Sequence, residues 1–151
     1  MIPPGAQILV RPLAAADIEA VMSVQARSRE ASQWSRDGYA RAAAGEYAAW
    51  VAAAGNSVVG FLVLRIVADE AEVLNLAVEP ESRRRGVAAG LLAAAIDASR
   101  AAGATRAFLE VRESNAGAIA FYQRQDFRLD GRRPKYYTGP REDALVLSRG
   151  L

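Results

Sequence analysis

The chain has 151 residues, of which 52% are hydrophobic and 24% are charged, with a formal net charge of +2. This length is typical of one domain with a buried core, so we expect a single domain over residues 1–151. The sequence contains no cysteine and no histidine. These absences exclude disulfides and thiolate nucleophiles and argue against zinc, and we expect no metal site. Any general base must then be Glu, Asp, Lys, Tyr or a water molecule.

Charge and hydropathy also limit the partners and the location of the protein. A net charge of +2 does not indicate a broad nucleic-acid surface. The N-terminal residues lack the pattern of a signal peptide, and no apolar run approaches membrane-spanning length. We therefore expect a cytoplasmic protein that binds neither nucleic acid nor a membrane.

The first half of the chain predicts a strand, two helices and a β-hairpin, in that order. Apolar residues at helical spacing indicate the first helix, Ser35 is a suitable N-cap for the second, and Gly55-Asn56 is typical of a hairpin turn. The expected elements are a strand at 6–10, a helix at 14–28, a short helix from Ser35 that Gly45 ends, and paired strands at 47–53 and 58–67.

The stretch from residue 75 to residue 89, NLAVEPESRRRGVAA, predicts an anion-binding site. An apolar strand at 73–78 ends in a polar turn, and a long alanine-rich helix runs from Gly86 to residue 102. A helix that starts after a tight loop leaves backbone N–H groups unpaired at the positive end of its dipole, where an anion is favoured. Consecutive arginines and small residues let a phosphate approach this backbone. The alternative interpretation is a solvated basic loop before a surface helix.

The second half of the chain places a carboxylate at the end of an apolar strand. The strand at 105–111 should lie parallel to the strand at 73–78, because a strand-helix-strand unit crosses over and returns alongside. Alternation puts Glu110 on one face of this strand, with Phe108, and Ala107, Leu109 and Val111 on the other. The remaining elements expected are a helix capped by Ser114-Asn115 and ending near Gln125, and strands at 127–132 and 143–147 joined by a basic, turn-rich segment.

Two sequence motifs resemble those of the GCN5-related N-acetyltransferase (GNAT) superfamily. Residues 83–88, RRRGVA, fit its cofactor-loop pattern (Q/R)-x-x-G-x-(G/A). Residues 109–127, LEVRESNAGAIAFYQRQDF, resemble the LEVRxSNxxAIxLYxxxGF signature of bacterial ribosomal-protein-alanine N-acetyltransferases, and KYY and REDA at 135–137 and 141–144 resemble the end of that group. Two departures are Asp126, where the group has Gly, and a shorter segment between Tyr137 and Arg141.

The resemblance implies a single mixed α/β domain of GNAT type that binds acetyl-CoA as a co-substrate. Its mostly antiparallel sheet would contain one parallel strand-helix-strand unit with a splay between the two strands, and helices would cover both faces. The pyrophosphate would lie on the amides of residues 85–89, and the pantetheine arm would pair with residues 76–78. The implied cofactor-binding residues are Leu76, Ala77, Val78, Arg83, Arg84, Arg85, Gly86, Val87, Ala88, Ala89, Asn115 and Tyr122.

Acetyl transfer to nitrogen requires a neutral amine, a stabilised thioester oxygen and a proton for the departing thiolate. By the same resemblance, Glu110 would be the general base and Tyr122 the general acid, and a backbone N–H at Ala77 or Val78 would stabilise the oxygen. From the residues alone, Glu110 could instead be a structural partner of an arginine, and Tyr122 one more core aromatic.

Three classes of function follow from these patterns. The first is direct acetyl transfer, through a ternary complex, to a protein N-terminus of the ribosomal-protein-alanine type. The second is transfer to a small amine or a lysine side chain, and the third is an acyl-CoA sensor without turnover. We expect acetyl-CoA and an amine as partners, and a monomer or weak homodimer.

Overall fold

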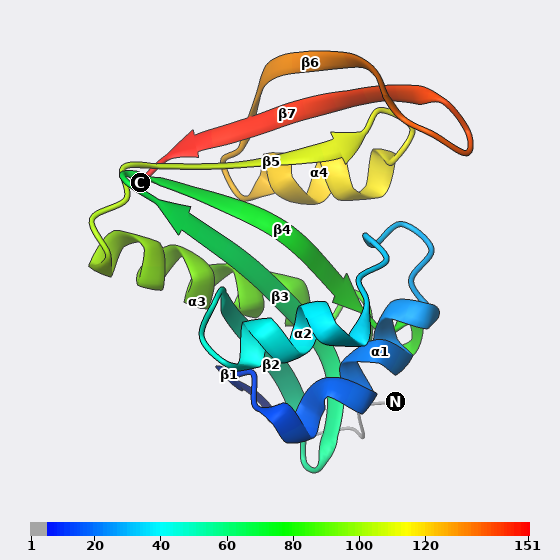
Figure 1. Ribbon diagram of the computed structural model, residues 1–151, viewed down its shortest axis with the longest axis vertical. Helices are drawn as coiled ribbons and strands as arrows, with labels where there is room; N and C mark the ends of the chain where they lie inside the picture. The colour runs from blue at the N-terminus through cyan, green and yellow to red at the C-terminus, as the bar shows by residue number, and fades with distance from the viewer. Residues whose placement is uncertain (1–5) are drawn as a thin grey trace.

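The computed structural model describes residues 6–151, which form one mixed sheet with helices on both faces (Figure 1). Within this part of the chain the sheet has seven strands in the order β1-β2-β3-β4-β5-β7-β6. The strands are β1 (Ile8–Pro12), β2 (Ala48–Ala54), β3 (Ser57–Val67), β4 (Glu70–Val78), β5 (Arg106–Arg112), β6 (Arg128–Tyr137) and β7 (Glu142–Gly150). The helices are α1 (Ile18–Ala26), α2 (Arg36–Ala43), α3 (Val87–Ala101) and α4 (Ala116–Arg124), with short 3-10 turns η1 (Ala15–Asp17) and η2 (Pro80–Ser82). The predicted mixed α/β architecture is confirmed.

Strands β4 and β5 form the parallel pair and separate along their length. Residues 70–72 of β4 pair with residues 106–108 of β5, and the recorded pairing ends there although the strands continue to Val78 and Arg112. Figure 1 shows the two ribbons diverging toward their C-terminal ends. The pairing of β4 with β3 skips Leu74, and such a bulge bends the strand and increases its twist. The expected splay is therefore present.

The two faces of the sheet are covered by different helices, because successive side chains of the central strands point to opposite sides. On one face, α3 packs on β3, and α4 contributes to the same apolar cluster, which includes Leu62 and Leu64 of β3. On the other face, α1 and α2 pack on Phe61 and Val63 of the same strand. Both helical layers therefore rest on β3, and the sheet positions the splay between them.

The C-terminal hairpin departs from the sequence prediction. The segment expected to be an irregular linker continues as β6 as far as Tyr137, paired with β7, with an irregular register after Arg133. Pro134 lies within β6. It is tolerated because β6 is an edge strand, whose outward-facing N–H groups have no partner strand to bond in the described part of the chain. Other boundaries differ by a few residues: for example, β4 begins at Glu70, and the first helix opens as η1 and ends at Ala26.

No helix within residues 6–151 is both long enough and apolar enough to cross a membrane. The cytoplasmic location stays a prediction.

Candidate active site

A cavity of about 1100 Å³ lies in the splay. It is bounded by β4, the start of α3, the end of β5, helix α4 and the segment between α1 and α2. The structure brings nearly all predicted site residues to this one cavity. Its lining includes Leu76, Ala77, Val78, Arg83, Arg84, Gly86, Val87, Ala88, Ala89, Glu110, Asn115 and Tyr122. Arg85 is not part of that lining, so the cavity brings together all of the predicted set except this residue.

The start of α3 forms one end of the cavity. Gly86 is the N-cap in the left-handed conformation, with φ of +78°, and no side chain caps the helix. Arg84 also has a positive φ, of +63°, so the chain turns sharply twice before the helix. The first helical hydrogen bond runs from the N–H of Gly90 to the carbonyl of Gly86, which leaves the N–H groups of residues 87–89 without helical partners. Such groups favour an anion, and we call this part of the cavity the anion-binding end; phosphate binding there stays a prediction.

The backbone of β4 presents polar groups to the splay at alternate residues. The N–H of Glu79 donates to the carbonyl of Val59 on β3 at 2.8 Å. Hydrogen-bonded pairs alternate in an antiparallel ladder, so Ala77 also faces β3, whereas Leu76 and Val78 face the splay. The carbonyl of Val78 accepts a hydrogen bond from Nε of Arg83 at 3.1 Å, which agrees with this direction. Of the two backbone N–H groups predicted to stabilise the thioester oxygen, the one at Val78 therefore points into the cavity.

Glu110 lies on β5 with 13% of its side chain exposed, 3.3 Å from the guanidinium of Arg133 on β6. The negative charge of Glu110, burial and a hydrogen bond to Glu110 raise the pKa of Tyr136. Glu110 thus has an arginine partner and a phenol partner, both supplied by β6. The neighbouring arginines of β5 are engaged elsewhere: Arg112 pairs with Glu142, and Arg106 with Glu70 and Asp130.

Tyr122 lies on α4, and Asn115 directly precedes this helix. Tyr122 is buried and makes T-shaped contacts with Phe121 and Phe127, at ring-centroid distances of 5.0 and 5.3 Å. Burial raises the pKa of the Tyr122 hydroxyl, which keeps it protonated at neutral pH. Asn115 is the N-cap of α4, and its Oδ1 accepts the N–H of Ala118 at 3.1 Å. Its cap role is as predicted.

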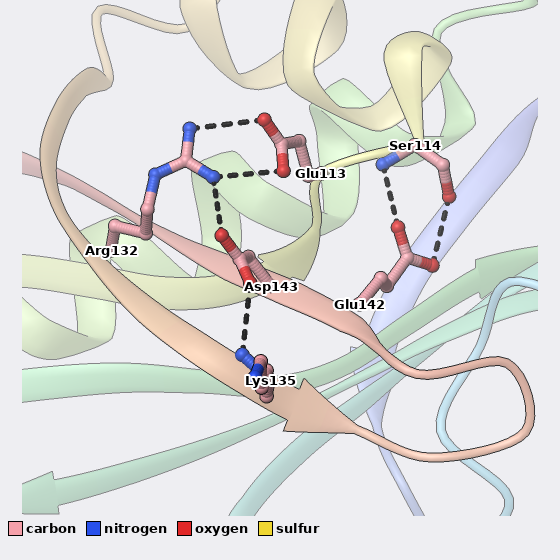
Figure 2. A network of polar contacts seen from close by, with 6 residues as sticks. All are labelled: Glu113, Ser114, Arg132, Lys135, Glu142 and Asp143. Carbon is pink, nitrogen blue, oxygen red and sulfur yellow. Dashed lines mark hydrogen bonds and ion pairs between the residues drawn. The ribbon is translucent and has the colours of Figure 1, made fainter.

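Sequence reasoning missed a polar network that joins the β5–α4 turn to the C-terminal hairpin. Arg132 of β6 contacts the carboxylates of Glu113 and Asp143, and Asp143 accepts the backbone N–H of Lys135 (Figure 2). Glu142 accepts both the N–H and the hydroxyl of Ser114 (Figure 2). The sequence did contain one sign of this network, because the REDA motif supplies Glu142 and Asp143. Nothing in the motif indicated which residues these carboxylates would contact.

Comparison with known proteins identifies the family of the chain. Residues 17–127 match the model of the family described as Acetyltransferase (GNAT) family. The chain belongs to this family and is an N-acetyltransferase.

One relative and two solved structures are similar over most of the chain. The [ribosomal protein bS18]-alanine N-acetyltransferase of Escherichia coli strain K12 is 33% identical over 134 residues, which cover 87% of this chain and 90% of that protein. The crystal structure of the ribosomal-protein-S18-alanine N-acetyltransferase from Escherichia coli has a TM-score of 0.85 and 31% identity, covering 95% of this chain and 94% of the other. Arabidopsis thaliana NAA60, solved in complex with acetyl-CoA, shares the fold, with a TM-score of 0.86 at 19% identity over 96% and 99% of the two chains.

Proposed function

We propose that this enzyme transfers an acetyl group from acetyl-CoA directly to the α-amine of a protein N-terminus, with an N-terminal alanine as the preferred acceptor. The observation that carries the proposal is a single cavity that contains a helix start, a carboxylate and a phenol. The 33% identity with a ribosomal-protein-alanine N-acetyltransferase supports the acceptor class. Location in the cytoplasm and a monomeric or weakly dimeric state belong to the same proposal.

The residues of the cavity fit acetyl-CoA, which supplies the acetyl thioester. Its pyrophosphate matches the free N–H groups of residues 87–89 and the positive charge of Arg83 and Arg84, because helix N-termini and guanidinium groups both favour phosphate. Arg85 would add charge from outside the cavity lining. The pantetheine arm would pair with the splay-facing carbonyl of Leu76 and be contacted by Asn115, since the N–H of Leu76 already donates to Oδ1 of Asn75. A volume of about 1100 Å³ leaves room for the acceptor beside it.

Glu110 is assigned as the general base. A protein N-terminus is largely an ammonium group at neutral pH and must lose a proton before nitrogen can attack. The carboxylate of Glu110 lies at the cavity with little exposure, and Arg133 and Tyr136 fix its orientation. A base held in one position transfers protons more effectively than a mobile one.

The other two steps are assigned to Val78 and Tyr122. Negative charge on the thioester oxygen is stabilised by a fixed donor aimed into the cavity, and the backbone N–H of Val78 has that direction. The C–S bond then breaks, Tyr122 gives its hydroxyl proton to the departing thiolate, and the proton that the acylated nitrogen loses restores the phenol. Burial raises the pKa of this hydroxyl, so the phenol stays protonated until the thiolate forms but is a weaker acid than a free tyrosine.

The test is acetyl transfer measured by mass spectrometry. Acetyl-CoA is offered with peptides that differ in their first residue, together with lysine peptides and small amines, and Glu110→Gln is the control. Acetylation of the Ala-first peptide that is lost in the control is the expected result. Transfer only to small amines or lysine side chains would replace the proposed acceptor. A CoA-dependent rise in melting temperature without any transfer would identify a sensor instead.

A further inference from the structure

Residues 28–34, which connect α1 to α2, form one wall of the cavity through Ser28, Glu30, Ala31 and Ser32. We call this segment the α1–α2 wall. Figure 1 shows it beside the C-terminal part of β4. Residues 28–34 belong to no helix or strand, so other contacts must fix their shape. Within the segment, the N–H of Ala31 and Nε2 of Gln33 donate to backbone carbonyls of the segment itself. Two buried side-chain amides, those of Asn75 and Gln25, tie the segment to β4 and α1.

The first amide is Asn75 of β4, which is 5% exposed. Its Oδ1 accepts the N–H of Ser32 at 3.1 Å, and its Nδ2 donates to the carbonyl of Ser32 at 2.9 Å. The same Oδ1 accepts the N–H of Leu76 at 3.1 Å, and the same Nδ2 donates to the hydroxyl of Tyr39 at 3.1 Å. All four hydrogen-bonding positions of the amide are therefore used. Asn75 holds the backbone of the α1–α2 wall much as a neighbouring strand would.

The second amide is Gln25 of α1, which contacts Trp34 in the same way. Its Nε2 donates to the carbonyl of Trp34 at 2.9 Å, and its Oε1 accepts the N–H of Trp34 at 2.9 Å. The hydroxyl of Tyr39 donates to Oε1 of Gln25 and accepts from Nδ2 of Asn75, so it joins the two amides. Tyr39 is completely buried. The three side chains form one connected network, in which every polar atom makes at least one hydrogen bond.

We propose that Asn75, Gln25 and Tyr39 are positioning residues that hold the α1–α2 wall in the shape that receives the acceptor. The proposal rests on the proposed function. If the register of β4 and β5 is continued past their last pair, Leu74 comes level with Glu110 and Asn75 follows directly. Ser32 is thus held beside β4 at the level of the assigned base. A wall fixed before the acceptor arrives removes part of the ordering cost of binding.

The position of Asn75 along the cavity distinguishes a role in acceptor binding from a role in acetyl-CoA binding. The anion-binding end begins at Arg83, beyond the last residue of β4, whereas Asn75 lies three residues before that end of the strand. Asn75 also occupies the N–H of Leu76, one of the two donors of β4 that face the splay. Val78 remains as the splay-facing donor for the reacting oxygen. Loss of the network should therefore weaken acceptor binding and leave acetyl-CoA binding unchanged.

The test combines hydrogen exchange with kinetics. Asn75→Asp keeps the size of the side chain but removes both donors, and Tyr39→Phe removes only the hydroxyl that joins the amides. Tyr47→Phe is the matched control, because Tyr47 packs against Trp34 with ring centroids 5.4 Å apart and lies outside the network. In the absence of any ligand, we expect amide exchange in residues 28–34 to be about tenfold faster in Asn75→Asp, the size of one lost hydrogen bond. Tyr39→Phe should show a smaller increase, and Tyr47→Phe none.

With an Ala-first peptide, KM for the peptide should rise about tenfold in Asn75→Asp, while kcat and the Kd of acetyl-CoA change less than about threefold. Faster exchange with an unchanged peptide KM would overturn the proposal, because the wall would then be held without serving the acceptor. Unchanged exchange in both variants would also overturn it. If Asn75→Asp does not fold, Tyr39→Phe decides by the same two measurements. If the wild-type protein acetylates no peptide, the proposed function fails, and exchange alone judges whether the network holds the wall.

Discussion

The two ends of the cavity are built in different ways. The anion-binding end comes from one continuous stretch, residues 83–89, and uses mainly backbone N–H groups at a helix start. The opposite end is assembled from segments far apart in the sequence: Glu110 from β5, Tyr122 from α4, Arg133 from β6 and Ser32 from the α1–α2 wall. The first end is main chain placed by a local turn. The second is a set of side chains placed by the whole fold.

This difference predicts how each end responds to substitution. Backbone N–H groups survive a change of side chain, so the anion-binding end should lose affinity gradually. A side chain that transfers a proton has no substitute nearby, so the acceptor end should lose turnover abruptly. Substitutions at the acceptor end should then lower kcat without changing the affinity for acetyl-CoA. Substitutions at the anion-binding end should lower that affinity without changing kcat.

The largest effect is expected for Glu110→Gln, which keeps the shape of the side chain but removes its basicity. We expect kcat to fall by about 10² to 10⁴-fold, the usual contribution of a general base, with the Kd of acetyl-CoA unchanged. Steady-state kinetics and titration calorimetry measure the two quantities. Glu113→Gln is the control, since Glu113 lies just beyond β5 and pairs with Arg132. Near-normal turnover in Glu110→Gln would remove Glu110 as the base.

A loss of about 10²-fold in kcat is expected for Tyr122→Phe, because the thiolate would leave without a proton donor. The hydroxyl makes no recorded hydrogen bond within residues 6–151, and its ring is fixed by Phe121 and Phe127. The melting temperature should therefore stay within about 2 °C of the wild type. A kcat equal to that of the wild type at every pH tested would exclude Tyr122 as the acid and leave it as a core aromatic.

The same contrast explains what the sequence could and could not predict. The anion-binding end follows from neighbours in the chain, and the turn, the glycine at positive φ and the helix start are all visible in RRRGVA. The face of Glu110 follows from strand alternation, and the cap at Asn115 from its position before a helix. These are local rules, and a single sequence is sufficient to apply them.

The acceptor end depends on contacts that no local rule specifies. Asn75 and Ser32 are 43 residues apart in the sequence, and an asparagine in an apolar strand gives no sign of its partner. The arginine beside Glu110 comes from a segment expected to be an irregular linker, which pairs with β7 as an edge strand instead. Pairing with a neighbouring strand overrode the local turn signals there.

A moderate effect is expected at the anion-binding end. Arg84→Gln should raise the Kd of acetyl-CoA about fivefold, which corresponds to about 1 kcal/mol for one partly screened charge, and kcat should not change. Calorimetry at low and high salt measures this, and the salt dependence should be weaker in the variant. Arg100→Gln, an exposed position near the end of α3, is the control. A fall in kcat as large as that of Glu110→Gln would show that the two ends do not act separately.

The smallest effect is expected at the turn after α4. Helix α4 is the element that carries Tyr122 into the cavity. Asp126 has a φ of +69°, and the N–H of Phe127 donates to the carbonyl of Tyr122 at 3.0 Å to close the helix. A left-handed conformation costs most residues about 1–2 kcal/mol, less for Asp, whereas Gly adopts it freely. Gly also gains freedom in the unfolded chain, so Asp126→Gly should stabilise the fold by only about 0.5 kcal/mol. That is about 1–2 °C in a thermal melt.

Asp126→Ala is the matched variant and should melt below the wild type, because Ala tolerates positive φ less well than Asp. Both variants should keep normal kcat, since Asp126 does not line the cavity in the splay. A lower melting temperature for Asp126→Gly would show that the Asp side chain itself stabilises the turn.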